Sequence, residues 1–385
     1  MRRTVTPRAR VLSLGSAWLV WIWLIALVAQ RHTPWLTGPT SWPASLQTRV
    51  TPLARWDSGW YIGLAENGYG PPPTRVGEET NHAFFPLYPL LMRALHAATG
   101  LETSLAGNLV SALSLLGALV LFARWTRRHL GEERAGPALL LLLLFPPSFF
   151  FAAVYTESLL LFLSLAAVEA AESDRPGTAA AAGFLAGLTR ISGVVLAPYL
   201  LLATLRSGRA RAVPARRAWA AAASAGLAPL AGFGLFCLYF GMRFGDPLLF
   251  ARAQHNWSKE PKTALEGPWL IAKTIVHDVT TGTVFHKSPA RTAEGFFLAL
   301  FLVVAAVLWR QSRRPEALYV AGTAGIVLLT GTLESGGRYV LPAFPAFAVM
   351  AALSERPRLF RALLALAVAA QAVYVWLFVH WLWVG

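Results

Sequence analysis

The chain has 385 residues, of which 56% are hydrophobic and 14% are charged, and its mean hydropathy is +0.50. These values lie outside the range of ordinary soluble domains and exclude a soluble enzyme. The net charge of +15 comes from arginines clustered in short segments between apolar stretches, a pattern typical of membrane topology signals and not of a nucleic-acid surface. The apolar stretches are long enough to cross about 30 Å of hydrocarbon, so we expect an all-α, polytopic integral membrane helical bundle.

The basic segments set the expected topology. They are residues 1–10, 124–134, 206–217, 310–315 and 355–361. If all of them face the cytoplasm, the chain between each consecutive pair must cross the membrane an even number of times. The apolar stretch 11–30 is long, rich in tryptophan and without a clean cleavage site, so we expect a retained first helix and not a signal peptide.

The elements that follow alternate between apolar helices and outer loops. We expect a first extracytoplasmic loop over 31–102 and a returning helix near 103–123. The next apolar stretch is about two spans long and is broken at Pro146 and Pro147, which predicts an outward and an inward helix joined near the outer face.

The second half of the chain continues this alternation. Residues 177–205 hold two short apolar pieces, for which we expect two short or re-entrant helices meeting at Arg190. The later expected elements are a helix over 218–241, a second extracytoplasmic loop over 242–292, and helices over 295–309, 316–333, 339–354 and 362–383. The whole chain, 1–385, is then one transmembrane domain of about eleven helices.

The first loop contains the motif RWDSGWYIGLAENGYG, which begins at Arg55 and holds one aspartate between two tryptophans. Trp56 and Trp60 are four residues apart, which predicts a short helix with both tryptophans at the bilayer edge. Asp57 and Tyr61 share the neighbouring stripe, so the carboxylate lies beside an aromatic wall. Two interpretations stay open: Asp57 is a catalytic carboxylate, or it caps this helix and pairs with Arg55.

The same loop continues with a second predicted helix, in NHAFFPLYPLLMRALHAATG. Its apolar positions are Leu87, Leu90, Leu91, Ala94, Leu95 and Ala98. This spacing predicts an amphipathic helix lying on the membrane surface. His82, just before it, is a candidate polar contact to a substrate phosphate or acceptor, although a lone loop histidine often has no such role.

Ionisable residues at the ends of apolar stretches form a second group of candidates. Glu157 and Arg190 are costly in lipid, so we expect each to face a cavity and to have a partner or a ligand. Arg190 is interpreted either as a phosphate contact or as one member of a structural ion pair. Arg338 and Tyr339 follow two glycines and are expected to open a helix from the outer side, where an arginine suits an anion.

The second loop begins with FGDPLLFARAQHNWSKEPK, which mixes basic and aromatic residues just past a membrane exit. Arg252, Gln254 and Trp257 are candidates for gripping a lipid phosphate, and a solvated basic interfacial helix is the equally weighted alternative. The chain has no Walker A motif, no Asp-x-Asp pair and no His/Cys array with metal-ligand spacing, so we expect neither a metal site nor another cofactor.

Several of these motifs, in this order, resemble the prokaryotic relatives of the second mannosyltransferase of GPI-anchor assembly, the PIG-V-like group of GT-C glycosyltransferases. They are RWDSGWY with LAENGY, FFPLYPLL, PPSFFFAAVYTESL, LTRISG, FGDPL with FARAQ, and GRYVLPAFPAF, within roughly residues 50–350. The resemblance is strongest in the tryptophan-aspartate motif and the FFPLYP segment after it. At LTRISG, Arg190 matches the family and its neighbours do not.

This resemblance implies a GT-C-like enzyme of the cell membrane with its active site on the extracytoplasmic face. Such an enzyme transfers a hexose, here expected to be mannose, from a polyprenyl-phosphate-sugar donor to a lipid, glycan or protein acceptor. Asp57 maps onto the family's base, Tyr155 and Glu157 onto its tyrosine-x-glutamate-serine turn, and Arg338 with Tyr339 onto its late arginine-tyrosine pair. The other expected substrate-binding residues are Arg55, Trp56, Trp60, Tyr61, Glu66, His82, Arg190, Arg252, Gln254 and Trp257.

The expected chemistry is compatible with a single carboxylate. In a direct, inverting displacement at the anomeric carbon, the acceptor hydroxyl loses a proton while a phosphate leaves, and a phosphate needs little help from a general acid. Two other classes stay open: a transporter or flippase of lipid-linked sugar, and a non-catalytic subunit of a glycan-assembly complex. The sequence shows no internal repeat of the kind common in transporters, and it keeps Asp57.

Overall fold

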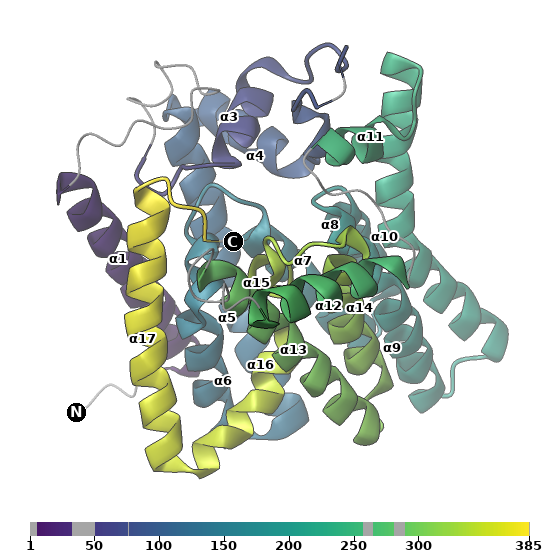
Figure 1. The fold of residues 1–385 in the computed structure, drawn as a ribbon. Coiled ribbons are helices and arrows are strands. Elements are labelled where there is room, and N and C mark those ends of the chain that lie inside the picture. Colours follow the sequence, from purple (N-terminus) through teal and green to yellow (C-terminus); the bar gives the residue numbers. More distant parts are fainter. Residues whose placement is uncertain (1–5, 33–50, 76, 257–264, 281–288, 385) are drawn as a thin grey trace. The chain divides into compact units, whose positions relative to one another are not determined.

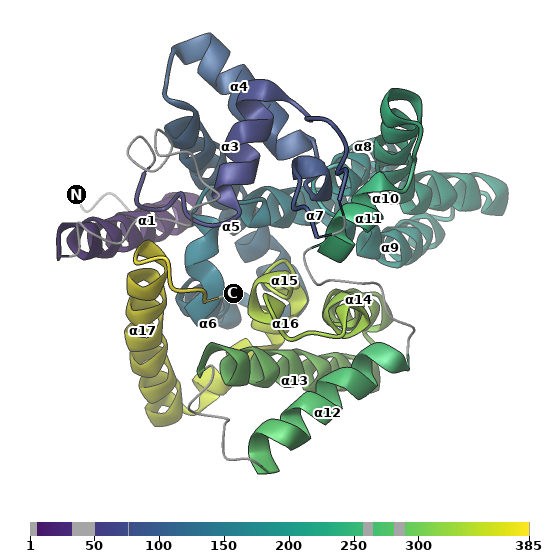
Figure 2. The same cartoon turned by 45° about the horizontal axis from the view of Figure 1, so that its top comes forward.

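The computed structural model describes residues 6–32, 51–75, 77–256, 265–280 and 289–384, and in this part of the chain every regular element is a helix (Figures 1 and 2). The chain forms two compact units, each assembled from separate stretches. Unit 1 contains Met1–Glu66, Tyr88–Glu169 and Phe344–Val384, and unit 2 contains Asn67–Leu87 and Ala170–Ala343. Stretches distant in sequence therefore build each unit.

Unit 1 is built around the long helix α5. Its elements are α1 (Pro7–His32), α3 (Ser58–Asn67), α4 (Leu87–Thr99), α5 (Thr103–Leu130), α6 (Glu132–Leu144), η2 (Pro146–Phe151), most of α7 (Glu157–Glu172), α16 (Phe344–Met350), η4 (Ala351–Glu355) and α17 (Pro357–Val379). Helix α1 packs against both α5 and α17 (Figure 1). A buried polar link joins three of these helices, because Trp18 Nε1 donates to Gln371 Oε1 at 3.1 Å and Gln371 Nε2 donates to the Leu143 carbonyl at 2.8 Å.

Ion pairs join the basic segments at one end of unit 1. Arg134 lies 2.7 Å from Glu355, which brings the predicted cytoplasmic segments 124–134 and 355–361 together. Arg124 and Arg128 each lie 2.8 Å from the buried Glu169. Two guanidinium groups thus stabilise the Glu169 carboxylate. The Arg134–Glu355 pair agrees with the expectation that segments 124–134 and 355–361 face the same side of the membrane.

Unit 2 is a second helical assembly. Its elements are η1 (Asn81–Ala83), α8 (Pro176–Gly187), η3 (Ile191–Val195), α9 (Leu196–Ala210), α10 (Ala215–Phe244), α11 (Leu249–Asn256), α12 (Glu266–Thr280), α13 (Pro289–Arg310), α14 (Arg314–Thr330) and α15 (Gly336–Tyr339). Helices α8 and α10 cross very closely, since a Cβ atom on Gly187 or Gly232 would lie 2.0 Å from a backbone oxygen of the other helix. Small residues that permit such close backbone approach are typical of helix pairs in membranes.

Six described helical segments are long and apolar enough to cross a membrane. They are Pro7–His32, Thr103–Leu130, Ile191–Ala210, Ala215–Phe244, Thr292–Arg310 and Pro357–Val379. Large apolar side chains on three of these helices, at Leu113, Leu227 and Val303, are 60 to 61% exposed, as expected for surfaces that contact lipid. The protein is thus a helical membrane protein, and the total of eleven spans stays a prediction because the remaining helices are shorter.

Most predicted breaks are confirmed. Helix α6 ends before the Pro146-Pro147 pair and α7 begins at Glu157, and α8 and α9 lie on either side of Arg190. Helix α4 is present where the amphipathic pattern predicts it. Its buried residues are Tyr88, Pro89 and Met92, whereas Leu90 and Leu91 of the predicted apolar face are exposed and available to a bilayer surface.

The helix predicted over 339–354 is present only from Phe344 onward, and its predicted start is wrong. Arg338 and Tyr339 do not open a helix but end the single turn of α15, and α16 begins only at Phe344. Pro342 and Pro345 account for the break, because proline lacks a backbone N–H and disfavours helical geometry in the residue before it.

Candidate functional site

Asp57 directly precedes helix α3 in unit 1 (Figure 1). Its backbone carbonyl accepts hydrogen bonds from the N–H groups of Trp60 at 3.0 Å and Tyr61 at 3.3 Å, so it begins the helical hydrogen-bonding pattern. Trp56, just before it, has φ of 55°, in the left-handed region that non-glycine residues rarely occupy. The prediction that Trp56 and Trp60 share a helical stripe is therefore wrong, since Trp56 lies in the turn that precedes the helix.

Tyr155 holds this turn from the other side. Its hydroxyl donates to the Arg55 carbonyl at 3.1 Å and accepts from the Asp57 N–H at 3.2 Å. One side chain thus bridges the residues on both sides of the strained Trp56. The Tyr155 ring is fully buried and packs 6.1 Å from the ring of Tyr61. These contacts position the Asp57 backbone, and the substrate contact predicted for Tyr155 stays a prediction.

Two polar side chains of α5 fix the segment that carries Tyr155. Asn108 Nδ2 donates to the Ala152 carbonyl at 2.8 Å, and Ser111 Oγ donates to the Ala153 carbonyl at 2.8 Å. Asn108 Oδ1 also accepts from Thr51 Oγ1 at 2.7 Å, which connects the same helix to the stretch before Arg55. Sequence reasoning missed both residues, although polar residues at i and i+3 inside an apolar helix are a usable signal.

The guanidinium of Arg55 is almost fully buried and forms its hydrogen bonds with backbone carbonyls. Nη1 donates to Thr51 at 2.9 Å and Ala54 at 3.1 Å, and Nε donates to Val379 at 3.3 Å. Burial lowers the pKa of Arg55 to about 10. Arg55 forms no hydrogen bond with Asp57 among the described residues, so the expected Arg55–Asp57 pair is not observed.

The C-terminal segment after α17 packs on this turn. The ring centroid of Trp56 lies 5.9 Å from that of Trp381 and 5.2 Å from that of Trp383, both in edge-to-face geometry, and Arg55 Cζ lies 5.2 Å from the Trp381 ring. Trp381 also has a positive φ, of 59°. Trp381 and Trp383 thus form an aromatic wall beside Trp56.

The remaining unit 1 candidates surround α3. Trp60 is half-buried, and the Tyr61 ring lies 5.5 Å from that of Tyr88. Glu157 opens α7 and is 1% exposed, as expected for an ionisable residue in the interior of a membrane bundle. Glu66, at the other end of α3, is exposed and lines a pocket. Unit 1 therefore contains Arg55, Trp56, Asp57, Trp60, Tyr61, Glu66, Tyr155 and Glu157.

Unit 2 contains the candidates Arg190, Arg252 and Arg338. Arg190 lies between α8 and η3, and its Cζ atom is 4.1 Å from the centroid of the Tyr339 ring. The neighbouring backbone turns back tightly, since a Cβ atom on Gly193 would lie 2.1 Å from the Ala186 carbonyl oxygen. Glycine is thus required in LTRISG for a steric reason. Arg190 and the late arginine-tyrosine motif, predicted separately, lie together.

Arg338 is held in the short helix α15. It is 4% exposed, and the N–H of the neighbouring Gly337 donates to the carboxylate of Glu294 on α13. Ser335, which precedes the helix, has φ of 65°. The Tyr339 ring that contacts Arg190 belongs to the residue after Arg338, so one arginine packs on this short helix and another belongs to it. Arginine side chains suit an anion.

His82, the candidate before helix α4, is packed among aromatic rings. His82 is fully buried, its ring lies 5.8 Å from Tyr69 and 5.0 Å from Phe244, and Nδ1 is 3.0 Å from Thr80 Oγ1. Burial lowers the pKa of His82, so the neutral ring is favoured. These contacts favour packing over the predicted substrate contact.

Helix α11 carries the second-loop motif and lies beside η1. Asp246 Oδ1 accepts from the Leu248 N–H at 3.0 Å, and Arg252 pairs with the same carboxylate. Gln254 Nε2 donates to the Ala83 carbonyl at 3.1 Å. Trp257 lies outside the described residues. Within the described part of the chain, no group of three or more His, Cys, Asp or Glu side chains is placed to hold a metal ion.

The family model described as Mannosyltransferase (PIG-V) matches residues 10–219, more than half of the chain. The chain belongs to the PIG-V mannosyltransferase family. The chain thus combines membership of this family with helices that are long and apolar enough to span a membrane. The matched range includes Asp57, Tyr155 and Arg190, whereas Arg338 and the C-terminal tryptophans lie beyond it.

Solved structures of the oligosaccharyltransferase of Archaeoglobus fulgidus are distantly similar to this PIG-V family member. The complex with zinc and sulfate has 14% sequence identity and a TM-score of 0.48, covering 96% of this chain and 53% of that one. The apo form has 15% identity and a TM-score of 0.44, covering 96% and 56%. The chain spans about half the length of these structures. No curated protein sequence matches it.

Proposed function

We propose that this PIG-V family member transfers mannose from a polyprenyl-phosphate-mannose donor to a hydroxyl of a lipid, glycan or protein acceptor. The reaction takes place on the extracytoplasmic face of the cell membrane and inverts the anomeric carbon, with Asp57 as general base. The observation that carries the proposal is the Asp57 turn, a carboxylate-bearing backbone position fixed by the Tyr155 hydroxyl inside the range that the family model matches.

The reaction balances with one base. The acceptor oxygen attacks the anomeric carbon, the bond between that carbon and the phosphate oxygen breaks, and the acceptor proton moves to the Asp57 carboxylate. The polyprenyl phosphate leaves with the bonding electrons and needs no separate acid. A backbone held on both sides of Asp57 favours this role, since a positioned base contributes only in the geometry in which it reaches the proton.

The leaving phosphate gains charge during transfer. We assign two arginines of unit 2 to bind it: Arg190, whose Cζ atom lies 4.1 Å from the centroid of the Tyr339 ring, and Arg338, the residue before Tyr339. Guanidinium groups match phosphate oxygens with two parallel donors, and such preorganised donors stabilise developing negative charge. Their chemistry supplies what a bound cation supplies in metal-dependent glycosyltransferases, so we expect full activity in the presence of a chelator.

The test uses the full-length protein purified into lipid nanodiscs, synthetic polyprenyl-phosphate mannose with a radiolabelled sugar, and membrane lipid extract as acceptor. We expect wild-type protein to transfer label and Asp57→Asn to lose roughly 10²–10⁴-fold in rate, the usual contribution of a general base. The matched control is Asp174→Asn. Asp174 lies in unit 2 and has φ of 56°, a conformation that asparagine tolerates well. We therefore expect this variant to keep wild-type activity.

Near-normal transfer by Asp57→Asn contradicts the base assignment. Absence of transfer by folded wild-type protein contradicts the donor assignment, and flux of the labelled lipid across vesicles then tests the flippase alternative. Nuclear magnetic resonance of the product reports the anomeric configuration, and retention of configuration contradicts a single displacement.

A further inference from the structure

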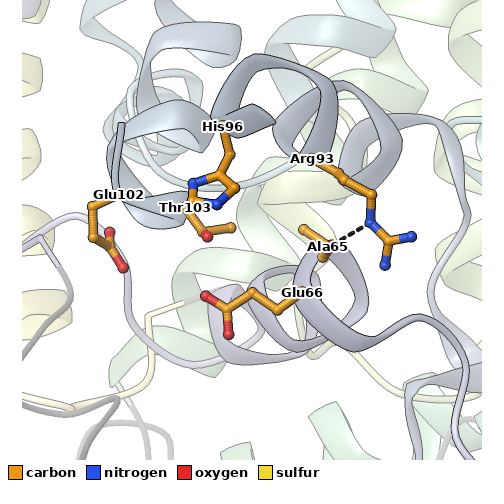
Figure 3. A pocket seen from close by; sticks show the side chains of 6 residues that line it. All are labelled: Ala65, Glu66, Arg93, His96, Glu102 and Thr103. Atoms are coloured by element: carbon orange, nitrogen blue, oxygen red, sulfur yellow. Dashed lines mark hydrogen bonds between the residues drawn. The ribbon is translucent and has the colours of Figure 1, made fainter. Parts of the chain in front are cut away.

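A polar pocket of about 430 Å³ lies at the C-terminal end of α3 in unit 1. Its lining residues are Ala65, Glu66, Arg93, His96, Glu102 and Thr103. They come from three elements: the end of α3, one face of α4 and the start of α5. Figure 3 shows the carboxylates of Glu66 and Glu102 and the ring of His96 around the same space. Ala65 and Glu66 belong to the LAENGY segment, whereas Arg93, His96, Glu102 and Thr103 belong to no family motif, and the proposed reaction uses none of the six residues.

Hydrogen bonds hold the pocket wall in place. Arg93 Nε donates to the Ala65 carbonyl at 2.5 Å and Nη2 donates to the Leu64 carbonyl at 3.4 Å, so this arginine satisfies the last carbonyls of α3 (Figure 3). Glu102 Oε2 accepts from the N–H of Ser104 at 2.8 Å and caps α5. The wall therefore joins three helix ends.

Part of the polar capacity of these side chains is left over. His96 Nδ1 lies 2.6 Å from the Leu101 carbonyl oxygen, which can only accept, so Nδ1 carries the proton and Nε2 of the neutral ring is an acceptor. Among the described residues, the Glu66 carboxylate, Glu102 Oε1 and Arg93 Nη1 make no hydrogen bond or ion pair. The pocket thus offers both acceptors and a donor to a ligand.

This mixture of groups selects a ligand class. Two carboxylates repel a phosphate, and a purely apolar ligand would leave charged groups without partners. A neutral polyol both donates and accepts, so it matches carboxylates, an imidazole acceptor and a guanidinium donor together. We propose that the pocket binds a sugar unit of a saccharide acceptor at a distance from the reacting hydroxyl. This inference rests on the proposed function, because it assumes an acceptor that carries a glycan.

The position of the pocket fits this role. Asp57 precedes the first residue of α3 and Glu66 lies near its end, so a rise of 1.5 Å per residue separates them by about 14 Å along one rigid helix. A glycan of a few units spans such a length, with one end at the base and the other in the pocket. The exposed Leu90 and Leu91 of α4 lie on the side of that helix suited to the membrane surface, where the headgroup of a glycolipid is located.

The decisive experiment measures binding without donor. Isothermal titration calorimetry compares octyl mannopyranoside and octyl glucopyranoside with the corresponding trisaccharides, using full-length protein in nanodiscs. We expect wild-type protein to bind one trisaccharide about tenfold more tightly than its monosaccharide. Glu66→Ala removes a side chain that makes no hydrogen bond or ion pair among the described residues, and Glu66→Trp fills the pocket. Both variants should bring the affinity ratio close to one.

The matched control is Glu133→Ala, an exposed glutamate of unit 1 outside the pocket, which should keep the wild-type ratio. Equal binding of short and long saccharides by wild-type protein overturns the inference, and so does a preference that survives Glu66→Trp. Because binding requires no transfer, the proposed reaction fails separately: a Glu66-dependent preference in a protein that transfers no mannose leaves the pocket assignment standing and rejects the proposed function.

Discussion

Tyr155→Phe removes one oxygen atom from a ring that stays in place. The lost hydroxyl bridges the Arg55 carbonyl at 3.1 Å and the Asp57 N–H at 3.2 Å. Each hydrogen bond contributes about 0.5–1.5 kcal/mol, so the loss of two destabilises unit 1 by about 1–3 kcal/mol. The larger consequence is expected in catalysis, because the turn that holds Trp56 at positive φ loses its restraint and a displacement of about 1 Å costs up to 10²-fold in rate.

Tyr88→Phe is the matched control. Tyr88 is also a fully buried tyrosine of unit 1, and its hydroxyl also has two contacts, to the Gly107 carbonyl at 2.9 Å and Ser111 Oγ at 2.8 Å. The two variants therefore remove the same chemistry from the same unit. Thermal unfolding in nanodiscs should show similar losses for both, whereas kcat for mannose transfer should fall about 10-fold to 100-fold for Tyr155→Phe alone.

The kcat and KM values of the two variants test whether the Tyr155 hydroxyl positions Asp57. Wild-type kcat in Tyr155→Phe refutes the positioning role of this hydroxyl. An equal loss of kcat in Tyr88→Phe also refutes a specific role of the Tyr155 hydroxyl, because the effect would then follow from destabilisation of unit 1 or from the Ser111 contacts that hold the segment of Tyr155. A rise in the acceptor KM with unchanged kcat would instead show that Tyr155 contacts the substrate.

Three other variants test unit 2. Gly193→Ala puts a Cβ atom 2.1 Å from the Ala186 carbonyl oxygen, so we expect a lower melting temperature and weaker donor binding through displacement of Arg190, and a wild-type donor KM contradicts this. Arg338→Ala should raise the donor KM more than the acceptor KM, and unchanged values for donor KM and kcat remove it from the site. Burial lowers the pKa of His82 from 6.5, so the stability of the folded protein should fall as the pH decreases from about 6.5 toward the lower folded-state pKa. In melting curves recorded at pH 5 to 7.5, His82→Phe should make the melting temperature depend less on pH.

The fold could be predicted wherever one local rule decides it. Apolar length predicts α1, α5 and α10, and the Pro146-Pro147 pair predicts the end of α6, because chain length against membrane thickness and the missing proline N–H act within a few residues. The same local rule explains the late start of the helix predicted over 339–354. Its apolar composition favours a helix from 339 onward, but Pro342 and Pro345 stand inside the range and delay the start to Phe344.

The site could be predicted only in part, because its contacts join distant stretches. A one-dimensional motif identifies Asp57 and Tyr155 as candidates, but the bond between them crosses 98 residues, and periodicity carries no information on such pairs. The same limit applies to the helical stripe proposed for Trp56. Side-chain periodicity assumes helical backbone, whereas the left-handed residue shifts the start of the helix to Ser58.

The C-terminal segment also supports the motif that contains Asp57. Arg55 Nε reaches the Val379 carbonyl, 324 residues away, and Trp381 covers the same guanidinium. Trp56 and Trp381 both have positive φ and pack edge to face, so each strained residue is stabilised by a contact that only the folded chain provides. Asp57 is therefore held from two directions, by Tyr155 on its backbone and by the C-terminal tryptophans on the residue before it. In the proposed reaction the Asp57 carboxylate acts as the base, and both supports would position it. The proposed role therefore depends on residues that the Asp57 motif itself does not contain.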